Sequence, residues 1–286
     1  MALTIQQQSN ATGFPKPAEL IEITGTSGLE AQDRAILNEL YRHAHDSGDL
    51  AKSDVQWAVS LAELNKTTHN GLERVRESLE RLMKVTLAVT YDGERGPETL
   101  LTGVFDYFII PQKGSPGATL KFSISAPLRA ILARSGRWGR IKAEVVHAMS
   151  SKYAIALYEL VRLRAGLRGT MTETFPINRF RALLGVPPGT YESGKDFKLR
   201  VIEPAVLEVN GLSEMGCKIE LVRAHSRAPI SKVVLAWWTK EGEEHRSAVQ
   251  ELNRSKLGRK ARLRGEVETV EPAPALVQTD LEEFTK

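Results

Sequence analysis

The sequence predicts an α+β protein made of two tandem winged-helix domains with flexible tails at both ends. The order helix, strand, helix, turn, helix, strand, wing, strand occurs once in each half of the 286 residues. Apolar residues recur at helical spacing in the expected helices and alternate in the expected strands. The two ends are polar or strongly charged, which is typical of segments that cannot bury enough apolar surface to fold.

Composition sets the broad class. With 42% hydrophobic residues the chain can bury a sizeable core, and its net charge is a modest +4. The single cysteine, Cys217, excludes an intrachain disulfide and a cysteine-based zinc site, and its place in an alternating apolar run predicts a core residue. The N-terminus lacks the pattern of a signal peptide, and no apolar run is long enough to span a bilayer. We therefore expect a cytoplasmic protein with no membrane partner.

The expected organisation has four parts. Residues 1–26 are expected to be a disordered arm, 27–148 the first winged-helix domain, 149–242 the second, and 243–286 a basic then acidic tail.

In the first half, a helix is expected over 29–45, then a short strand near Trp57 and a short helix over 61–64. A polar turn over 65–69 leads to a helix capped by Asn70 that runs to about Lys84. Its expected buried face consists of Leu72, Val75, Leu79, Leu82 and Met83. A strand over 85–91, a turn at Asp92-Gly93 and a strand over 99–110 then form the expected wing. The predicted DNA-contacting residues of this half are Lys66, Thr67, Arg74 and Arg76.

Between the halves, basic residues surround Trp138 in residues 134–142. Two interpretations stay open for this segment. It could touch a phosphate backbone, or it could be a solvated connector between domains.

The second half centres on residues 191–238, in which a basic-then-apolar helix precedes two alternating strands. On a helical wheel, one broad apolar face is formed by Phe197, Val201, Ile202, Ala205, Val206 and Val209. The opposite side carries Asp196, Arg200 and Glu203, with Leu199 and Lys195 at its edge, whereas Lys198 falls on the apolar side. Arg200 is the best candidate for a base contact, because arginine can bind guanine O6 and N7 together. An ordinary amphipathic helix with a solvated charged face is the alternative.

Two further features belong to this half. Pro204 lies inside the helical pattern and predicts a kink or a restart of the helix. The strands 216–224 and 231–239 enclose a basic loop suited to phosphates. The remaining predicted DNA-binding residues are Arg223, Arg227 and Lys232 of this wing, and Arg179 and Arg181 of the preceding short helix.

The segments SKYAIALYELVRL, FRALLGV and TYESGKDFKLRVIEPAVLEVN resemble the second winged-helix domain of the iteron-binding plasmid replication initiators. The resemblance covers about residues 150–240, and it implies that Pro204 is tolerated. It implies that the second domain recognises the repeated origin sequence, the iteron, in double-stranded DNA. The first domain would contact DNA in the monomer and form the interface in dimers. The wing loop RAHSRAPIS departs from the family because its tip carries fewer charges.

The resemblance also implies function and partners. Monomers would start replication at direct repeats, and dimers would repress their own promoter or couple origins. The implied partners are a second copy of the chain and the host replication initiator, helicase and helicase loader.

The C-terminal tail supports two hypotheses. Residues 254–264 hold six basic residues, which could follow phosphates or could be a solvated helix end. Residues 265–286 are acidic and are expected to be disordered. Within them, Gln278, Leu281 and Phe284 resemble peptides that dock on bacterial sliding clamps, with one extra residue before Phe284.

An enzyme is not expected. The six histidines are scattered without acidic residues at metal-ligand spacing, and no phosphate-binding loop or serine nucleophile motif is present. No catalytic residue, metal or cofactor is therefore predicted. The competing binding function is a winged-helix transcriptional repressor without a replication role, which the pattern alone does not separate from an initiator.

Overall fold

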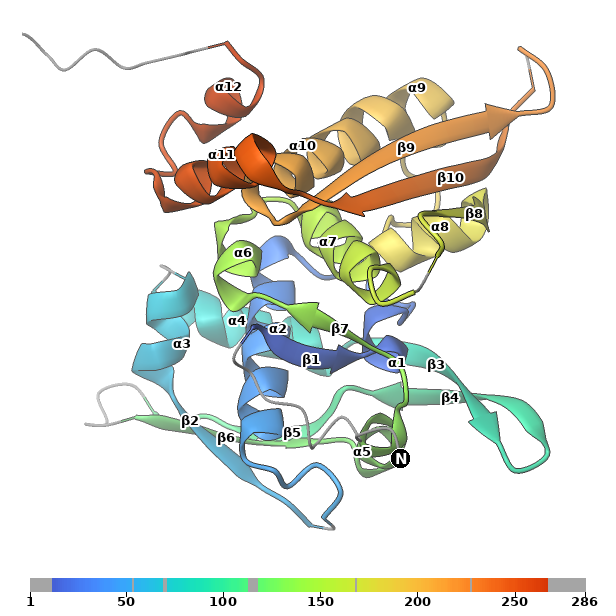
Figure 1. The fold of residues 1–286 in the computed structure, drawn as a ribbon. Helices are drawn as coiled ribbons and strands as arrows, with labels where there is room; N and C mark the ends of the chain where they lie inside the picture. The colour runs from blue at the N-terminus through green and yellow to red at the C-terminus, as the bar shows by residue number, and fades with distance from the viewer. Residues whose placement is uncertain are drawn as a thin grey trace, which may run out of the picture.

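The computed structural model describes residues 12–52, 54–68, 71–112, 118–167, 169–226 and 228–266, with the side chains of 65–68 and 92 left out. The described chain forms two winged-helix units stacked along a shared central helix, followed by a short C-terminal helical extension (Figure 1). Within the described segments, none of the helices combines the length and apolarity that a membrane span requires.

The first unit contains β1 (Phe14–Pro17), α1 (Ala18–Ile21), α2 (Ala31–Asp46), β2 (Trp57–Ser60), α3 (Leu61–Thr68), α4 (Leu72–Met83), β3 (Thr86–Gly93), β4 (Gly96–Gly103), β5 (Phe105–Ile109), β6 (Thr119–Ile124), α5 (Ala126–Arg134), β7 (Trp138–Ile141) and α6 (Ala143–Ala148). The second contains α7 (Lys152–Arg164), β8 (Thr172–Pro176), α8 (Ile177–Leu184), α9 (Gly194–Phe197), the π-helical turn η2 (Lys198–Ile202), α10 (Glu203–Leu212), β9 (Met215–Arg223) and β10 (Ile230–Thr239). The extension contains α11 (Gly242–Asn253) and α12 (Arg259–Leu263).

The two units have the same sheet plan. In the first, β6 lies between β2 and β5, and in the second, β10 lies between β8 and β9, with all pairs antiparallel. The β5–β6 hairpin of the first unit therefore corresponds to the β9–β10 wing of the second. The β3–β4 hairpin pairs only with itself among named strands, so it is an insertion after α4.

This plan corrects the expected first wing. The strand expected over 99–110 is two strands, β4 and β5, which belong to different sheets. The chain changes sheets after Gly103, and the register of β5 shifts between Phe105 and Tyr107. In the sequence, every second residue stays apolar or small from β4 into β5. This pattern therefore could not show that the chain changes from one sheet to another.

Two helix boundaries also differ from expectation. Helix α3 continues through Thr68, so residues 65–68 are helical rather than a turn. Helix α4 begins at Leu72 after an N-cap at Gly71, and Asn70 lies outside the described residues. On α4, Val75, Leu79 and Leu82 are buried, whereas Leu72 and Met83 are 53% and 42% exposed. The expected apolar face is therefore narrower than predicted, because the two ends of the helix extend past the core.

The N-terminal segment is packed from residue 14 onward, which corrects the expectation of a disordered arm for that part. Strand β1 pairs antiparallel with β7, and Phe14, Leu20 and Ile23 are buried. Residues 1–11 lie outside the description. The same pairing identifies the segment around Trp138 as a strand of the first unit, with the Arg140 guanidinium 5.0 Å from the Trp138 ring. Residues 138–141 are therefore a paired strand and not a solvated connector, whereas Arg134 and Arg137 are exposed and contact with a phosphate backbone stays a prediction.

Helix α7 joins the units, because it contacts α1, α2 and β7 of the first and α8, α10 and β9 of the second (Figure 1). Its buried Glu159 accepts hydrogen bonds from Lys16 Nζ at 2.7 Å and from Asn38 Nδ2 at 2.6 Å. Burial lowers the pKa of Lys16, and the charge of Glu159 opposes that shift. A buried lysine keeps its charge only beside such a partner, so this contact ties β1 and α2 to α7.

Candidate nucleic-acid interface

Residues 194–212 form one continuous helix built from α9, η2 and α10, and it precedes the β9–β10 wing. The helix begins at a side-chain cap, because Ser193 Oγ accepts from the Asp196 amide at 3.1 Å. Its inner face packs into the core through Phe197, Val201 and Val209, all of which are buried. The predicted amphipathic helix is confirmed in its extent and in its buried face.

The π-helical turn explains how Pro204 fits without ending the helix. The amide of Glu203 donates to the carbonyl of Lys198, five residues earlier, so the turn before the proline is widened. A proline has no amide hydrogen, and its ring collides with the carbonyl four residues before it in a regular α-helix. The wider turn therefore accommodates Pro204, and the helix continues through Leu212 instead of restarting.

The outer side of this helix carries five of the predicted DNA-binding residues of the second domain. The exposed charged side chains are Lys195, Asp196, Lys198, Arg200 and Glu203. Lys198 was expected on the apolar side, but its side chain is 63% exposed and lies 3.7 Å from Glu203. The helical wheel assumed a uniform turn, and the π-helical turn invalidates that assumption for this residue.

Leu199 also lies on this outer side, and it is 50% exposed. The wheel placed it only at the edge. A large apolar side chain on a recognition helix can contact the methyl group of thymine. The charged residues on both sides of Leu199 in the sequence are the signal that could have identified it as an exposed candidate contact.

The predicted basic residues of the wing differ in their contacts and exposure. Arg223 Nη1 donates to the carbonyl of Ala228 at 2.6 Å, so part of its guanidinium closes the loop. A Cβ on Gly194 would lie 2.5 Å from Arg223 Nη2. The start of the 194–212 helix, which holds the position of the recognition helix in a winged-helix fold, therefore lies against the wing. Lys232 is exposed on β10, and Arg227 lies outside the described residues.

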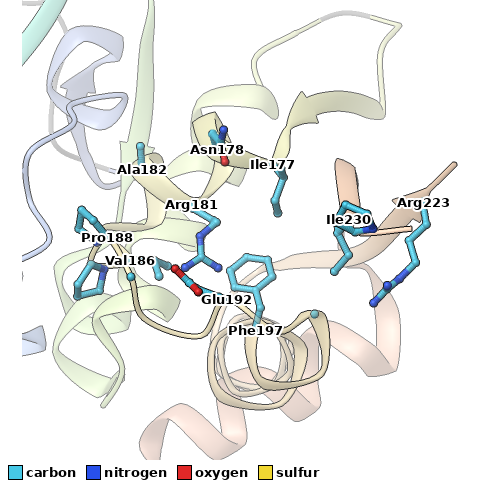
Figure 2. Close-up of a pocket in the computed structure, with 14 residues that line it drawn as sticks. Ile177, Asn178, Arg181, Ala182, Val186, Pro188, Glu192, Phe197, Arg223 and Ile230 are labelled. Atoms are coloured by element: carbon cyan, nitrogen blue, oxygen red, sulfur yellow. The ribbon is translucent and has the colours of Figure 1, made fainter. Parts of the chain in front are cut away.

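A groove of about 490 Å³ separates α8 from the wing, and Arg181 projects into it (Figure 2). Its Nη1 donates to the carbonyl of Tyr191 at 3.0 Å and its Nη2 to that of Thr190. The guanidinium lies 4.9 Å from the Phe197 ring, and partial burial lowers the Arg181 pKa. Arg181 therefore holds the loop that leads into the recognition helix. Arg179 on the same helix is 59% exposed and lies 3.9 Å from Glu22.

In the first unit, α4 occupies the place that the recognition helix occupies in the second. Arg81 fixes it to α2 through two hydrogen bonds of 2.8 and 3.0 Å to the buried carboxylate of Asp33. Arg74 is exposed on α4 and Arg76 is half-buried. Lys66 and Thr67 belong to α3, and their side chains lie outside the description.

The basic segment 254–264 is folded and partly buried, so it is more than a solvated helix end, and its contact with phosphates stays a prediction. Arg259 is buried and donates to the carbonyl of Ala148 at 3.1 Å. Arg262 donates to both carboxylate oxygens of Glu251, at 2.6 and 2.9 Å. The predicted clamp-binding residues Gln278, Leu281 and Phe284 lie outside the described residues.

The described residues show no metal cluster, since no three His, Cys, Asp or Glu side chains among them could hold an ion. Cys217 is buried, and burial raises its pKa to about 12, so the thiol stays protonated. The prediction that Cys217 is a core residue is confirmed.

This fold and site define a tandem winged-helix protein. Residues 16–162 match the family model described as Initiator Replication protein, WH1, and residues 176–236 match Initiator Rep protein, WH2. The chain belongs to this initiator replication protein family, as the resemblance predicted. The first match includes most of α7, which we expected to open the second domain.

One solved structure supports this fold. A crystal structure of Pi initiator protein in complex with iteron DNA is 15% identical, with a TM-score of 0.59, and the match covers 82% of this chain and 100% of that chain. A second match is the WH1 domain of a replication protein isolated from a multiple sclerosis patient, at 14% identity and a TM-score of 0.26, covering 36% of this chain and 81% of that domain. Comparison with curated protein sequences gave no match.

Proposed function

We propose that this protein is a sequence-specific, double-stranded DNA-binding replication initiator of a plasmid. The observation that carries the proposal is the exposed row of charged side chains from Lys195 to Glu203 on a helix braced against a wing. Such a helix fits the major groove, where arginine and acidic side chains distinguish base pairs. Pi initiator protein, which shares the fold, was solved in complex with iteron DNA.

In this proposal the monomer binds direct repeats at the origin and starts replication. The second domain recognises the repeat, with Arg200 in base contact, and the first domain adds contacts through α3 and α4. The dimer, joined through the first domain, represses its own promoter and couples origins. The partners are DNA, a second copy of the chain, and the host initiator, helicase and loader, all in the cytoplasm. No catalytic step is assigned to the protein.

A footprint of the purified protein on the DNA beside its own gene tests this proposal. Protection of several direct repeats next to an AT-rich segment supports an initiator. Protection of one inverted repeat alone supports a transcriptional repressor and contradicts the initiator role. Dilution or a weakened first-domain interface should also increase direct-repeat binding. A monomeric variant that fails to bind direct repeats would contradict the monomer–dimer scheme.

We also propose that the end of the chain binds the sliding clamp, through Gln278, Leu281 and Phe284. A peptide with two apolar anchors is the kind of segment that docks in a groove. Deletion of residues 276–286 should abolish clamp binding in a pull-down while leaving DNA binding intact. Unchanged clamp binding after deletion would remove this part of the proposal.

A further inference from the structure

The recognition helix borders a second groove, which lies away from the wing. Its volume is about 830 Å³. Its walls come from α2, the start of α7, η2 and the C-terminal helix α12. Arg200 on the recognition helix contributes one side of this groove, and Lys260 and Arg264 contribute another. The groove thus joins the candidate base-contacting residue to a helix that lies beyond residue 236, where the second family match ends.

Helix α12 is fixed in orientation by one of its faces. The buried Arg259 donates to the carbonyls of Ala148 and Arg254, at 3.1 and 2.8 Å, and Arg262 is bound to Glu251. Leu263 packs against Gly211 of α10, where an added Cβ would lie 2.2 Å from a Leu263 methyl carbon. Because Arg259, Arg262 and Leu263 all contact the rest of the protein, the helix has little freedom to rotate.

The other face of α12 carries Lys260 and Arg264, which are four residues apart and therefore lie on one side of a helix. Both are exposed, and both line the groove. Arg264 Nη1 lies 3.6 Å from Glu266, an exposed pair of the kind that contributes little and exchanges readily. Lys256 is directed elsewhere, because its Nζ donates to the carbonyl of His147 at 3.0 Å.

The charge balance of the groove favours an anionic ligand. Its cations are Lys152, Arg200, Lys260 and Arg264, and its carboxylates are Glu30 and Glu208. Glu208 is buried and accepts from the amides of Ser150 and Ser151 at 2.9 and 3.2 Å, so its oxygens are occupied by protein donors, and the four cations still outnumber the two carboxylates. Glu30 lies 3.8 Å from Arg81. Lys152 donates to the carbonyl of Ser27 at 2.7 Å, which fixes its ammonium at the edge of the groove.

We propose that α12 is part of the DNA-binding surface, and that Lys260 and Arg264 bind the phosphate backbone beside the bases contacted by the recognition helix. The proposal rests on the proposed DNA-binding function. It adds a phosphate site in the C-terminal extension, outside both winged-helix units. Anchoring of α12 through Arg259 and Leu263 holds the two cations in place before DNA arrives, so little side-chain and helix ordering remains for binding.

The test compares two double variants of the full chain. Lys260→Ala/Arg264→Ala removes the two groove cations, and Arg246→Ala/Arg254→Ala removes two exposed cations of the same extension that do not line this groove. Binding to cognate repeats and to random duplex is measured by fluorescence anisotropy between about 50 and 200 mM salt. Thermal melting of each variant checks that the fold is retained.

The groove variant should bind cognate and random duplex more weakly by a similar factor, on the order of tenfold at about 0.1 M salt. The slope of log affinity against log salt should become shallower by about 1.8, since each lost phosphate contact contributes about 0.9. The control variant should change both quantities much less. A folded groove variant with unchanged affinity and slope would overturn the proposal, as would an equal loss in the control.

Two other outcomes are distinguishable. A loss confined to cognate DNA with an unchanged salt slope would show that α12 does not bind phosphate, and it would also overturn the proposal. If the wild-type protein binds cognate and random duplex equally, the proposed sequence-specific function fails. The phosphate site is then still tested on random DNA by the same pair of variants.

Discussion

The two winged-helix units share one sheet plan but present their recognition helices differently. In the second unit, the helix from Gly194 to Leu212 leads directly into the wing strands β9 and β10. In the first, the β3–β4 hairpin is inserted between α4 and the corresponding strands β5 and β6. The second unit is therefore the simpler winged helix, and the first carries additional structure around the same framework. The order of helices and strands along the sequence is the same in both halves, but it does not show which hairpin is the wing. Strand pairing shows that.

The units also differ in what fixes them. The first is held to α7 by the N-terminal strand β1 and the buried contact between Lys16 and Glu159. The second is braced from outside by the extension, since α11 and α12 both contact α10 and Leu263 packs against Gly211. Within the extension, Glu251 of α11 binds Arg259 and Arg262 of α12. The first unit is thus stabilised by β1 and the second by the α11–α12 extension, and both segments lie outside the order of elements that the two halves share. The contribution of each segment to stability can be tested separately.

The largest effect is expected from Glu159→Ala. Removal of the carboxylate leaves Lys16 charged and buried without its partner, which typically costs about 3–5 kcal/mol. The free energy of unfolding from urea titration should fall by that amount. Lys16→Met/Glu159→Leu removes both charges and should recover much of the loss. A loss below about 1 kcal/mol for Glu159→Ala would show that β1 does not hold the first unit in place.

A smaller effect is expected at the recognition helix itself. Arg200→Ala should weaken binding to the cognate repeat by about 1–3 kcal/mol and relax its specificity. Arg246→Ala, on the exposed face of α11, is the charge-matched control and should change binding little. An equal loss for Arg200→Ala on random duplex would assign Arg200 to phosphate instead of to a base.

Arg181→Ala should lower the free energy of unfolding by about 1–2 kcal/mol, because hydrogen bonds to the loop carbonyls of Thr190 and Tyr191 are lost. Arg179→Ala on the same helix is the matched control, and we expect a change within about 0.5 kcal/mol. Denaturation of the two variants separates them. Equal stability of both would show that Arg181 does not hold the loop, and would leave it available as a DNA contact.

The weakest effect concerns pH and the extension. Hydrogen bonds from Arg262 lower the Glu251 pKa from its usual 4.5. A carboxylate whose folded pKa is depressed contributes stability above its unfolded pKa, and this contribution is lost as pH falls from 4.5 through the lower folded value. Amide hydrogen exchange in residues 242–264, corrected for intrinsic rates, should therefore speed up over that window. Glu251→Gln should make the exchange fast and insensitive to pH there.

The sequence predicted much of the second unit and less of the first. The amphipathic pattern of 195–210 predicted the recognition helix, and alternation predicted both wing strands. Pro204 indicated a kink, but the π-helical turn that absorbs it depends on tertiary packing that periodicity does not encode. In the first unit, the change of sheet after Gly103 left the alternation intact.

The sequence predicted which charged residues belong to the site, but it did not predict what each of them contacts. Lys195, Asp196, Arg200 and Glu203 are exposed as expected, whereas Arg181 is engaged by a loop, and only the structure shows those carbonyl partners. The polar residues around the N-terminal arm concealed its buried strand, because Lys16 looks like a surface residue until Glu159 is seen beside it. Long-range pairs of this kind leave no local signal.

The most direct test of the account is guanine N7 methylation interference on the cognate repeat, with wild-type protein and Arg200→Ala compared. If Arg200 contacts guanine O6 and N7 in the major groove, methylation of one guanine per repeat should block the wild type and cease to matter for the variant. Interference at all other guanines should be unchanged. Identical interference patterns for the two proteins would contradict base recognition by Arg200.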